Sequence, residues 1–342
     1  MRKLVSFIFA MLLFWSTAFA DIDIYFLDVG QGDAAVIVCD GELMMIDGGN
    51  PGDSQFIYSF LRNTLCVDHM KLMVATHPHD DHIGGLPATL NAVEVETILS
   101  PVRDYDSKRF SSLLKYAPQG VVVPDLGDTF QLGNALITVL GPATTSYENI
   151  NDWSIVLRID YGNTSFLFTG DASEVAESDI LASGEDLDSD VLKVGHHGSS
   201  SSSTSSFLEV VSPAYAIISV GSGNSYGHPS EETIDRLASI GARIYRTDLN
   251  GTIKCHSDGQ EITFETERIL QPEQTSETST KAIDEPASQS EEYSYVGNMN
   301  SHKFHYPDCQ SVSQMKEKNK CFFTSRDEAV GQGYVPCKNC NP

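Results

Sequence analysis

The chain of 342 residues is short of positive charge, with 22 lysine and arginine residues against 47 aspartate and glutamate residues. Eight of the basic residues but only four of the acidic ones lie in residues 1–20 or after residue 292. Residues 21–292 therefore hold 14 basic and 43 acidic residues, a net charge of about −29. Such a body cannot hold nucleic acid by a general attraction to phosphates. Any anionic substrate must be attracted locally, by metal ions or by the C-terminal residues.

Long apolar runs are also absent after residue 20. The opening segment has a positive start at Arg2-Lys3, an apolar stretch from Leu4 to Trp15 and the small-x-small sequence Ala18-Phe19-Ala20. This pattern is typical of a secretory signal peptide, cleaved before Asp21. An uncleaved membrane anchor is the alternative, but the apolar stretch is short for a membrane span. The sequence therefore predicts a secreted or periplasmic protein with no stable membrane association after cleavage.

Large apolar side chains are almost missing from residues 271–292, which consist mainly of Gln, Glu, Ser, Thr, Ala and Pro. Such a segment cannot bury a core, so a disordered linker is predicted there. The chain then divides into a signal peptide (1–20), a large domain (21–270), the linker (271–292) and a small domain (293–342). Cysteine follows this division, because four of the seven cysteines lie in the last 34 residues.

The large domain alternates short apolar runs with turns and helical patterns. Strands are predicted at residues 22–27, 34–39, 43–46, 71–75, 95–99, 120–123, 135–140, 155–159, 165–168, 191–194, 214–220, 243–245 and 252–255. Helices are predicted at residues 54–64, 86–92, 172–182 and 231–240. Strands first, then alternating strands and helices, repeated twice, favour an α/β fold in which helices cover two packed sheets, an αββα sandwich.

The chemistry is concentrated in residues 77–82, which read His-Pro-His-Asp-Asp-His. The stretch follows the apolar run Leu72–Ala75 and precedes two glycines, so it forms a loop at a strand end, where functional residues tend to lie. Imidazole and carboxylate groups are the usual ligands of zinc and related ions. Four candidate ligands exceed what one ion takes from one loop and indicate a two-metal centre: His77, His79, Asp81 and His82. A histidine-rich surface loop that binds nothing is the alternative.

Further candidates follow other predicted strands. The carboxylate of Asp171 can bridge two metal ions or, alternatively, cap the next helix. The adjacent His196 and His197 are candidate ligands or surface residues, and His228 is a candidate ligand or a turn histidine. Asp47 can orient a ligand histidine, or it can accept backbone N–H bonds in a turn.

The sequence His77-x-His79-x-Asp81-His82, with Asp47 before it and Thr169-Gly170-Asp171 after it, resembles the metallo-β-lactamase superfamily. Three further stretches narrow the resemblance to the hydrolase domain of the ComEC family of DNA-uptake proteins: Phe26–Asp33, Val194–Ser199 and Asn224–Pro229. The resemblance covers about residues 21–264. The superfamily's usual histidine of the third motif is absent, and Asn151 stands in that region, as in ComEC-like domains.

This resemblance implies a metal-dependent hydrolase. His77 and His79 would hold one ion, Asp81 and His82 the second, and Asp171 would bridge the two. One of His196, His197 and His228 would complete the ligand shell, and another would protonate the leaving oxygen. The two ions are zinc or manganese, because Asn151 in place of a histidine favours weak binding or an ion that prefers oxygen ligands. Asp47 would orient a ligand histidine without binding a metal ion itself. Lys193 is interpreted as a phosphate contact or as a solvated lysine at a strand end.

The small domain has its own candidate metal site. Three thiols and one imidazole form a complete tetrahedral zinc set with no open position: His305, Cys309, Cys337 and Cys340. One structural zinc ion would supply folding energy that fifty residues cannot obtain from a core. Two disulfides are the alternative, since export permits them. Cys321 lies outside the pattern, and His302 is a possible substitute ligand.

The stretches Phe304–Cys309, Ser325–Ala329 and Gly333–Cys337 resemble the zinc-binding domain of Ada-type DNA-repair proteins. Six lysine and arginine residues of the small domain could form a basic face for DNA. The leading hypothesis is therefore a secreted, metal-dependent phosphodiesterase that cleaves DNA and is tethered to it by the small domain. A lactonase or esterase of the same fold, and a DNA-binding protein without activity, are the alternatives.

Overall fold

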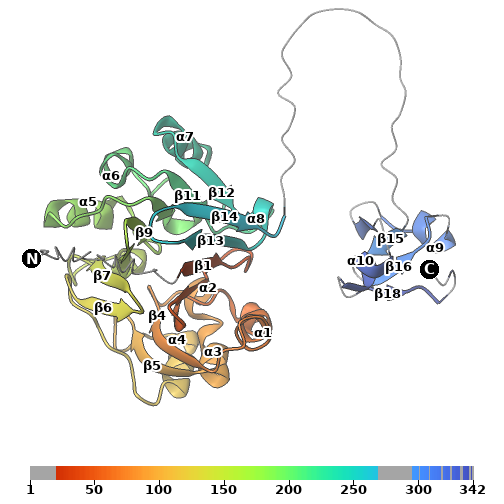
Figure 1. Ribbon diagram of the computed structural model, residues 1–342, viewed down its shortest axis with the longest axis horizontal. Coiled ribbons are helices and arrows are strands. Elements are labelled where there is room, and N and C mark those ends of the chain that lie inside the picture. The colour runs from red at the N-terminus through yellow and green to blue at the C-terminus, as the bar shows by residue number, and fades with distance from the viewer. Residues whose placement is uncertain are drawn as a thin grey trace, which may run out of the picture. The chain divides into compact units, whose positions relative to one another are not determined.

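The computed structural model describes residues 21–268 and, from residue 295 onward, residues 295–299, 301–307, 309–316, 319–323, 326–331, 334–338 and 340. The chain forms two compact units that divide between Pro272 and Glu273 (Figure 1). The predicted signal peptide (1–20) and the predicted linker (271–292) lie outside the described residues. No helix among those described is long and apolar enough to cross a membrane.

The first sheet of the larger unit has seven strands in the order β14-β13-β1-β2-β3-β4-β5. Strands β3, β4 and β5 run parallel, and the other neighbours run antiparallel. Along β1, every second side chain is buried between the sheets, as the period of a strand requires. The bounds are β1 (Ile22–Phe26), β2 (Ala35–Cys39), β3 (Glu42–Ile46), β4 (His69–Val74), β5 (Glu94–Leu99), β13 (Ile253–Ser257) and β14 (Ile262–Thr266).

The second sheet also has seven strands, in the order β12-β11-β10-β9-β8-β7-β6. Strands β9 to β12 run parallel, so their carboxyl ends meet at one edge, where ligands bind in open α/β sheets. Strands β6 to β9 run antiparallel. The bounds are β6 (Thr129–Leu132), β7 (Ala135–Gly141), β8 (Val156–Tyr161), β9 (Thr164–Phe168), β10 (Val191–Lys193), β11 (Tyr215–Ile218) and β12 (Arg243–Arg246).

The two sheets pack face to face over an apolar core, in which the rings of Phe26 and Phe168 stack with centroids 5.7 Å apart. Helices cover the outer face of each sheet, with α1, α3 and α4 on the first and α5, α6 and α7 on the second (Figure 1). The predicted αββα sandwich is therefore confirmed. The helix bounds are α1 (Ser54–Ser59), α3 (Leu86–Ala92), α4 (Lys108–Tyr116), α5 (Glu174–Ser183), α6 (Ser205–Val211) and α7 (Glu231–Ser239).

Short helical turns complete the larger unit and carry several candidate residues: η1 (Pro51–Asp53), η2 (Phe60–Thr64), α2 (Asp80–Ile83), η3 (Ile150–Trp153), η4 (Gly195–Gly198) and α8 (Thr247–Asn250). One predicted strand, at residues 120–123, is wrong. Only Val122 pairs there, in a single bridge with Leu99. Pro124 follows and has no amide proton to donate to the next rung of the ladder.

The smaller unit contains a four-stranded sheet in the order β17-β15-β16-β18. Phe304, Phe323 and Ala329 form its small apolar core. Its elements are β15 (Tyr295–Asn298), β16 (Lys303–His305), α9 (Gln310–Ser313), β17 (Lys320–Phe323), α10 (Arg326–Gly331) and β18 (Val335–Pro336).

Candidate metal centre

The candidate ligands of the larger unit lie in loops that follow the parallel strands β3, β4, β9, β10 and β11. These loops surround a cavity of about 480 Å³. Its lining includes Gln31, Pro78, His79, Asp80, Asp81, Tyr105, Asp106, Ser107, Asn151, Asp171, His196, His197, Tyr226 and His228. No lysine or arginine is among these described lining residues, although four aspartates are.

The first ligand group joins His77, His79 and Asp171, whose ligand atoms all lie within 4.8 Å of one another. The Nε2 atom of His77 lies 3.0 Å from Nδ1 of His79 and 3.8 Å from Oδ2 of Asp171. Burial lowers the pKa of His77 and of His79, which favours the neutral imidazoles that metal ions bind. This group can therefore hold one ion.

The second group joins Asp81, His82 and His197 within the same limit of 4.8 Å. His197 Nε2 lies 3.3 Å from Asp81 Oδ2, and His82 Nε2 lies 3.3 Å from Asp171 Oδ1. Asp171 thus lies near histidines of both groups, since Oδ2 is 3.8 Å from both His77 and His197 and Oδ1 is 3.3 Å from His82, which places it where a bridging carboxylate would lie. The alternative role of Asp171 as a helix cap is wrong, because α5 begins at Glu174 and Ser173 caps it by accepting the amide of Val175.

His196 and His228 lie beside these groups rather than within them. His196 Nε2 is 3.6 Å from Asp171 Oδ2, and the ring of His196 packs edge-on against that of His228, with centroids 5.6 Å apart. Both rings line the cavity. Of the three histidines considered for the last ligand position, the geometry places His197 in a group, whereas a ligand role for His196 or His228 stays a prediction.

Asp47 contacts a candidate ligand directly. Its Oδ2 atom lies 2.7 Å from Nδ1 of the buried His82 and accepts the hydroxyl of Thr76, while Oδ1 accepts the Thr76 amide. The carboxylate therefore both orients a histidine, leaving Nε2 for a metal, and satisfies a backbone donor of the turn. The two roles considered for Asp47 occur together.

The sequence did not reveal the buried ion pair that Asp33 and Lys193 form next to His197. Asp33 Oδ1 lies 3.2 Å from His197 Nδ1, and Asp33 Oδ2 lies 2.7 Å from Lys193 Nζ. Burial alone would raise the pKa of Asp33, but Lys193 and His197 outweigh it and hold this pKa well below its ordinary value. The interpretation of Lys193 as a solvated residue is wrong, because its side chain is only 4% exposed. A phosphate contact finds no support either, since the ammonium faces Asp33.

Asp33 fixes the ring of His197 by accepting from Nδ1, as does the carbonyl of Ser219 at 3.1 Å. Nε2 is then the atom left for a metal. Although burial would lower it, Asp171 and Asp33 raise the pKa of His197 to about 10, so an ion must displace a proton there. The sequence gives one sign of this ion pair: Lys193 stands among the apolar residues of a buried strand, and a buried lysine needs a negative charge nearby.

We expect Lys193→Met to lower the free energy of unfolding by about 3 kcal/mol, because it removes the nearer of the two cations beside the buried Asp33 carboxylate, at 2.7 Å, and leaves the charge balanced by His197 at 3.2 Å. Urea unfolding of the metal-free chain measures this change. The double variant Asp33→Asn/Lys193→Met should recover most of the loss, since it removes both charges. A single variant as stable as the original chain would contradict this assignment of the ion pair.

Orphaned polar atoms show that the cavity suits metal ions. Several buried side-chain atoms in the described part of the chain have no hydrogen-bond partner, and four of them belong to the candidate site: His82 Nε2, Asp171 Oδ1, His197 Nε2 and Asn151 Oδ1. Buried polar atoms are almost always satisfied, and a bound ion is one of the ordinary explanations when they are not. Asn151 lies on η3 and lines the cavity. Its amide oxygen adds one oxygen donor to a set of candidate ligands that is rich in histidine nitrogen.

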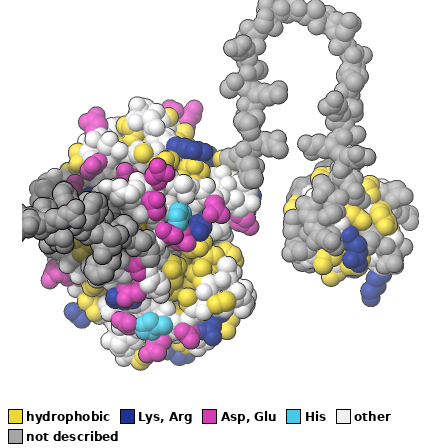
Figure 2. Space-filling view, viewed as in Figure 1, with side chains coloured by type: hydrophobic (Ala, Val, Ile, Leu, Met, Phe, Trp, Pro, Cys, Tyr) yellow, Lys and Arg dark blue, Asp and Glu magenta, His cyan; other side chains and the backbone are white. Residues whose placement is uncertain are grey.

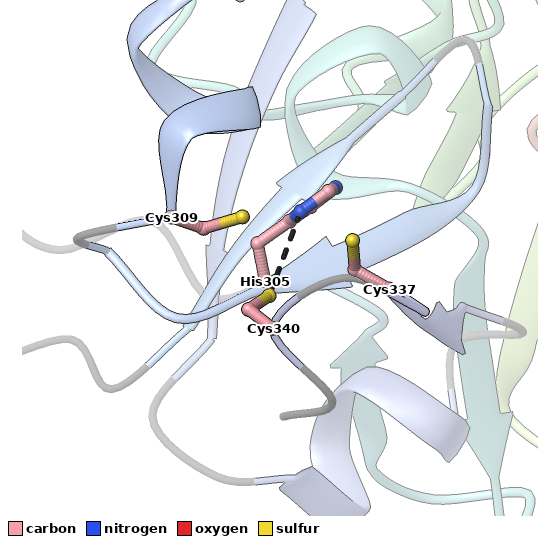
Figure 3. Close-up of side chains that lie close together, drawn as sticks. All are labelled: His305, Cys309, Cys337 and Cys340. Carbon is pink, nitrogen blue, oxygen red and sulfur yellow. Dashed lines mark hydrogen bonds between the residues drawn. The ribbon is translucent and has the colours of Figure 1, made fainter.

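The smaller unit brings its four predicted ligands together. The ligand atoms of His305, Cys309, Cys337 and Cys340 lie within 4.8 Å of one another, and their side chains point toward a common centre (Figure 3). Cys340 Sγ lies 3.9 Å from His305 Nδ1. All seven cysteines are in the described part of the chain, and none forms a disulfide. Cys321 lies apart and donates to the Tyr334 hydroxyl, so the cluster suits one tetrahedral zinc ion.

Comparisons with known proteins identify a family for each part of the chain. Residues 27–222 match the metallo-beta-lactamase superfamily, and residues 279–342 match the metal binding domain of Ada. The chain is 28% identical over 258 residues to ComE operon protein 3 of Bacillus subtilis (strain 168), which covers 70% of this chain and 33% of that protein. It is 29% identical over 228 residues to competence protein ComA of Neisseria gonorrhoeae, covering 66% and 31%.

The chain thus spans about a third of the length of these curated relatives. Among solved structures, the metallo-beta-lactamase fold protein YhfI from Bacillus subtilis aligns with a TM-score of 0.47 and 13% identity, over 66% of this chain and 96% of that one. The resemblances predicted for the two parts of the sequence are confirmed by the family matches. Because the first match covers more than half of its residues, the chain belongs to the metallo-β-lactamase superfamily of metal-dependent hydrolases, and its C-terminal region carries the metal-binding domain of Ada.

Proposed function

We propose that this chain is an exported phosphodiesterase that cleaves DNA with metal-activated water. The observation that carries the proposal is the pair of ligand groups, joined by Asp171, at the floor of one open cavity. Paired metal sites of this kind serve in-line displacement at phosphorus. One of the relatives is named competence protein ComA, and the ComEC-like stretches of the sequence favour a nucleic-acid substrate.

The protein's own residues would hold and orient this centre. His77, His79 and Asp171 would bind one zinc or manganese ion, and Asp81, His82 and His197 the other. When bound, such ions lower the pKa of a coordinated water and neutralise charge that develops on phosphorus. Asp47 and Asp33 keep the imidazoles of His82 and His197 turned inward.

The charge of the larger unit makes local capture of DNA necessary. Acidic side chains recur across the visible face of this unit (Figure 2). The described residues that line the cavity include no lysine or arginine. The C-terminal region, by contrast, has six basic residues against four acidic ones from residue 293 onward. We assign to it a weak tethering contact with DNA phosphates, which becomes weaker as salt is raised.

The proposal is tested by incubating the full chain with single-stranded and double-stranded DNA, after loading with zinc or with manganese. Metal-dependent cleavage that a chelator stops is the expected result. The same preparation is offered lactones and thioesters, because a two-metal centre can also attack carbonyl carbon. Hydrolysis of these esters without cleavage of any DNA would replace the proposal with the lactonase or esterase alternative. Binding of DNA without any hydrolysis would favour a non-catalytic protein.

We expect His228→Ala to slow DNA cleavage by about 10²-fold, because this ring lines the cavity and is the candidate donor of a proton to the leaving oxygen. Hydrolysis of bis(p-nitrophenyl) phosphate should change much less, since p-nitrophenolate leaves without protonation. Initial rates on both substrates give the ratio, with His69→Ala as the control, because His69 is exposed and pairs with Glu96 away from the cavity. Equal losses on the two substrates would assign His228 to metal binding instead.

A further inference from the structure

Two tyrosines outside both ligand groups line the cavity of the metal centre. Tyr226 lies in the loop that follows β11 of the second sheet, and its side chain is 70% exposed. Tyr105 lies in the loop that follows β5 of the first sheet, with its ring edge-on to Phe110 at 6.4 Å. The cavity therefore receives one aromatic side chain from each half of the sandwich.

The Tyr226 side chain is 70% exposed, which leaves a face of its ring open to solvent. The ring lies nearly parallel to that of His228, with an interplanar angle of 15° and centroids 5.9 Å apart. The His228 ring in turn packs against His196, whose Nε2 lies 3.6 Å from Asp171. A planar group placed on the open face of Tyr226 would extend this series of rings outward from the metal centre.

The loop that carries Tyr226 is held in a fixed shape. The side-chain oxygen of Asn224 accepts the amides of Tyr226 and His228 at 3.0 and 3.1 Å, and its nitrogen donates to the carbonyls of Gly221 and His228 at 3.0 and 2.6 Å. A ring on such a loop is in position before a ligand arrives, so little ordering entropy is lost on binding.

The negative charge of the cavity lining limits how it could bind a polynucleotide. The described lining has no lysine or arginine, and Asp80 and Asp106 lie on it beside the ligand aspartates. Arg109 is the cation beside Asp80, and it is already paired with that carboxylate at 3.2 Å. Phosphates are therefore attracted mainly at the metal ions, and the remaining carboxylates would repel a second phosphate backbone. Stacking of bases on aromatic rings is the interaction that remains, and it does not depend on sequence.

We propose that Tyr226 is a base-stacking residue which makes the centre select unpaired nucleotides, with Tyr105 as a second wall. This inference rests on the proposed phosphodiesterase function. In the interior of a duplex, both faces of each base are covered by its neighbours, so such a base cannot lie on Tyr226. In a single strand, a base next to the cleaved phosphate can turn onto the open face of the ring.

The test compares kcat/KM of the metal-loaded full chain on three oligonucleotides of equal length: a single strand, its blunt duplex, and a single strand of abasic units. We expect the wild-type chain to prefer the base-bearing single strand. Tyr226→Ala should lower kcat/KM on that strand by roughly tenfold, mainly through KM, and should leave the slower abasic reaction unchanged. Tyr226→Phe keeps the ring and should keep the preference. Tyr58→Ala is the matched control, because Tyr58 is exposed on α1, outside the cavity.

A second readout does not depend on turnover. A single strand that contains 2-aminopurine should lose fluorescence on binding to the wild-type chain and to Tyr226→Phe, but not to Tyr226→Ala. Equal losses of kcat/KM on base-bearing and abasic strands, or a Tyr226→Phe variant as impaired as Tyr226→Ala, would overturn the stacking role while DNA cleavage stands. If the wild-type chain cleaves no oligonucleotide, the proposed function fails. Quenching that requires Tyr226 would then still support stacking, and its absence would overturn that role too.

Discussion

Turnover is expected to fall by at least roughly 10³-fold when Asp171 is replaced by alanine. This carboxylate is 2% exposed, and its oxygens lie between 3.3 and 3.8 Å from nitrogens of His77, His82, His196 and His197. Its removal takes a shared ligand from both groups, and metal ions contribute several kcal/mol to the stabilisation of such transition states. Initial rates on DNA, with metal content measured on the same samples, check this result.

The control for this variant is Asp235→Ala, since Asp235 is exposed on α7 and is not among the residues that line the cavity. Asp81→Ala should behave like Asp171→Ala in activity but should affect only the second ligand group. Both active-site variants should keep a cooperative unfolding transition, because neither side chain belongs to the apolar cores. Unchanged rates in both would mean that hydrolysis takes place elsewhere on the chain.

Cys337→Ser is expected to unfold the smaller unit and leave the larger one folded. Among the described residues of the smaller unit, the apolar cluster holds three buried side chains with three partly buried neighbours, and Val296 and Val312 are also buried, which is too little to order about fifty residues. A tetrahedral zinc site contributes on the order of 10 kcal/mol to folding, so the loss of one thiolate removes the main stabilising term. Differential scanning calorimetry should show one transition where the unchanged chain shows two, with one zinc ion fewer per chain.

Cys321→Ser supplies the comparison, because this thiol contacts Tyr334 rather than the cluster. It should keep both transitions and the full metal content. A Cys337→Ser chain that retains a cooperative transition of the smaller unit would refute the structural role of zinc there.

Local patterns made much of the larger unit predictable. Every second residue of β1 is apolar, and the four candidate ligands from His77 to His82 fall within six consecutive positions, so chemistry and spacing can be read directly. Helices α4 and α6 and strands β6 and β14 were not predicted. Strand β14 lies at the edge of its sheet and contributes only Ile262 and Phe264 to the core, both partly buried, so its apolar alternation is too short to stand out.

Pairings across the chain could not be read in this way. Asp33 and Lys193 are 160 residues apart in sequence, yet their charged groups lie 2.7 Å apart behind His197. Whether His196, His197 or His228 joins the second ligand group depends on how the backbone turns each side chain. His196 and His197 both have positive φ angles, of 48° and 55°, a conformation that residue type does not announce. Residue type alone therefore does not distinguish His197 from His196 and His228, whereas their positions in space do.

The two ligand sets of this chain differ in softness, and this sets an order of metal loading. Three thiolates and an imidazole in the smaller unit make a closed site that zinc prefers, whereas the larger unit offers imidazoles and carboxylates around an open cavity. We expect the C-terminal cluster to fill first when zinc is scarce, which would leave the site of the larger unit available to other divalent ions. Activity would then depend on the supply of those ions, while the smaller unit would stay folded.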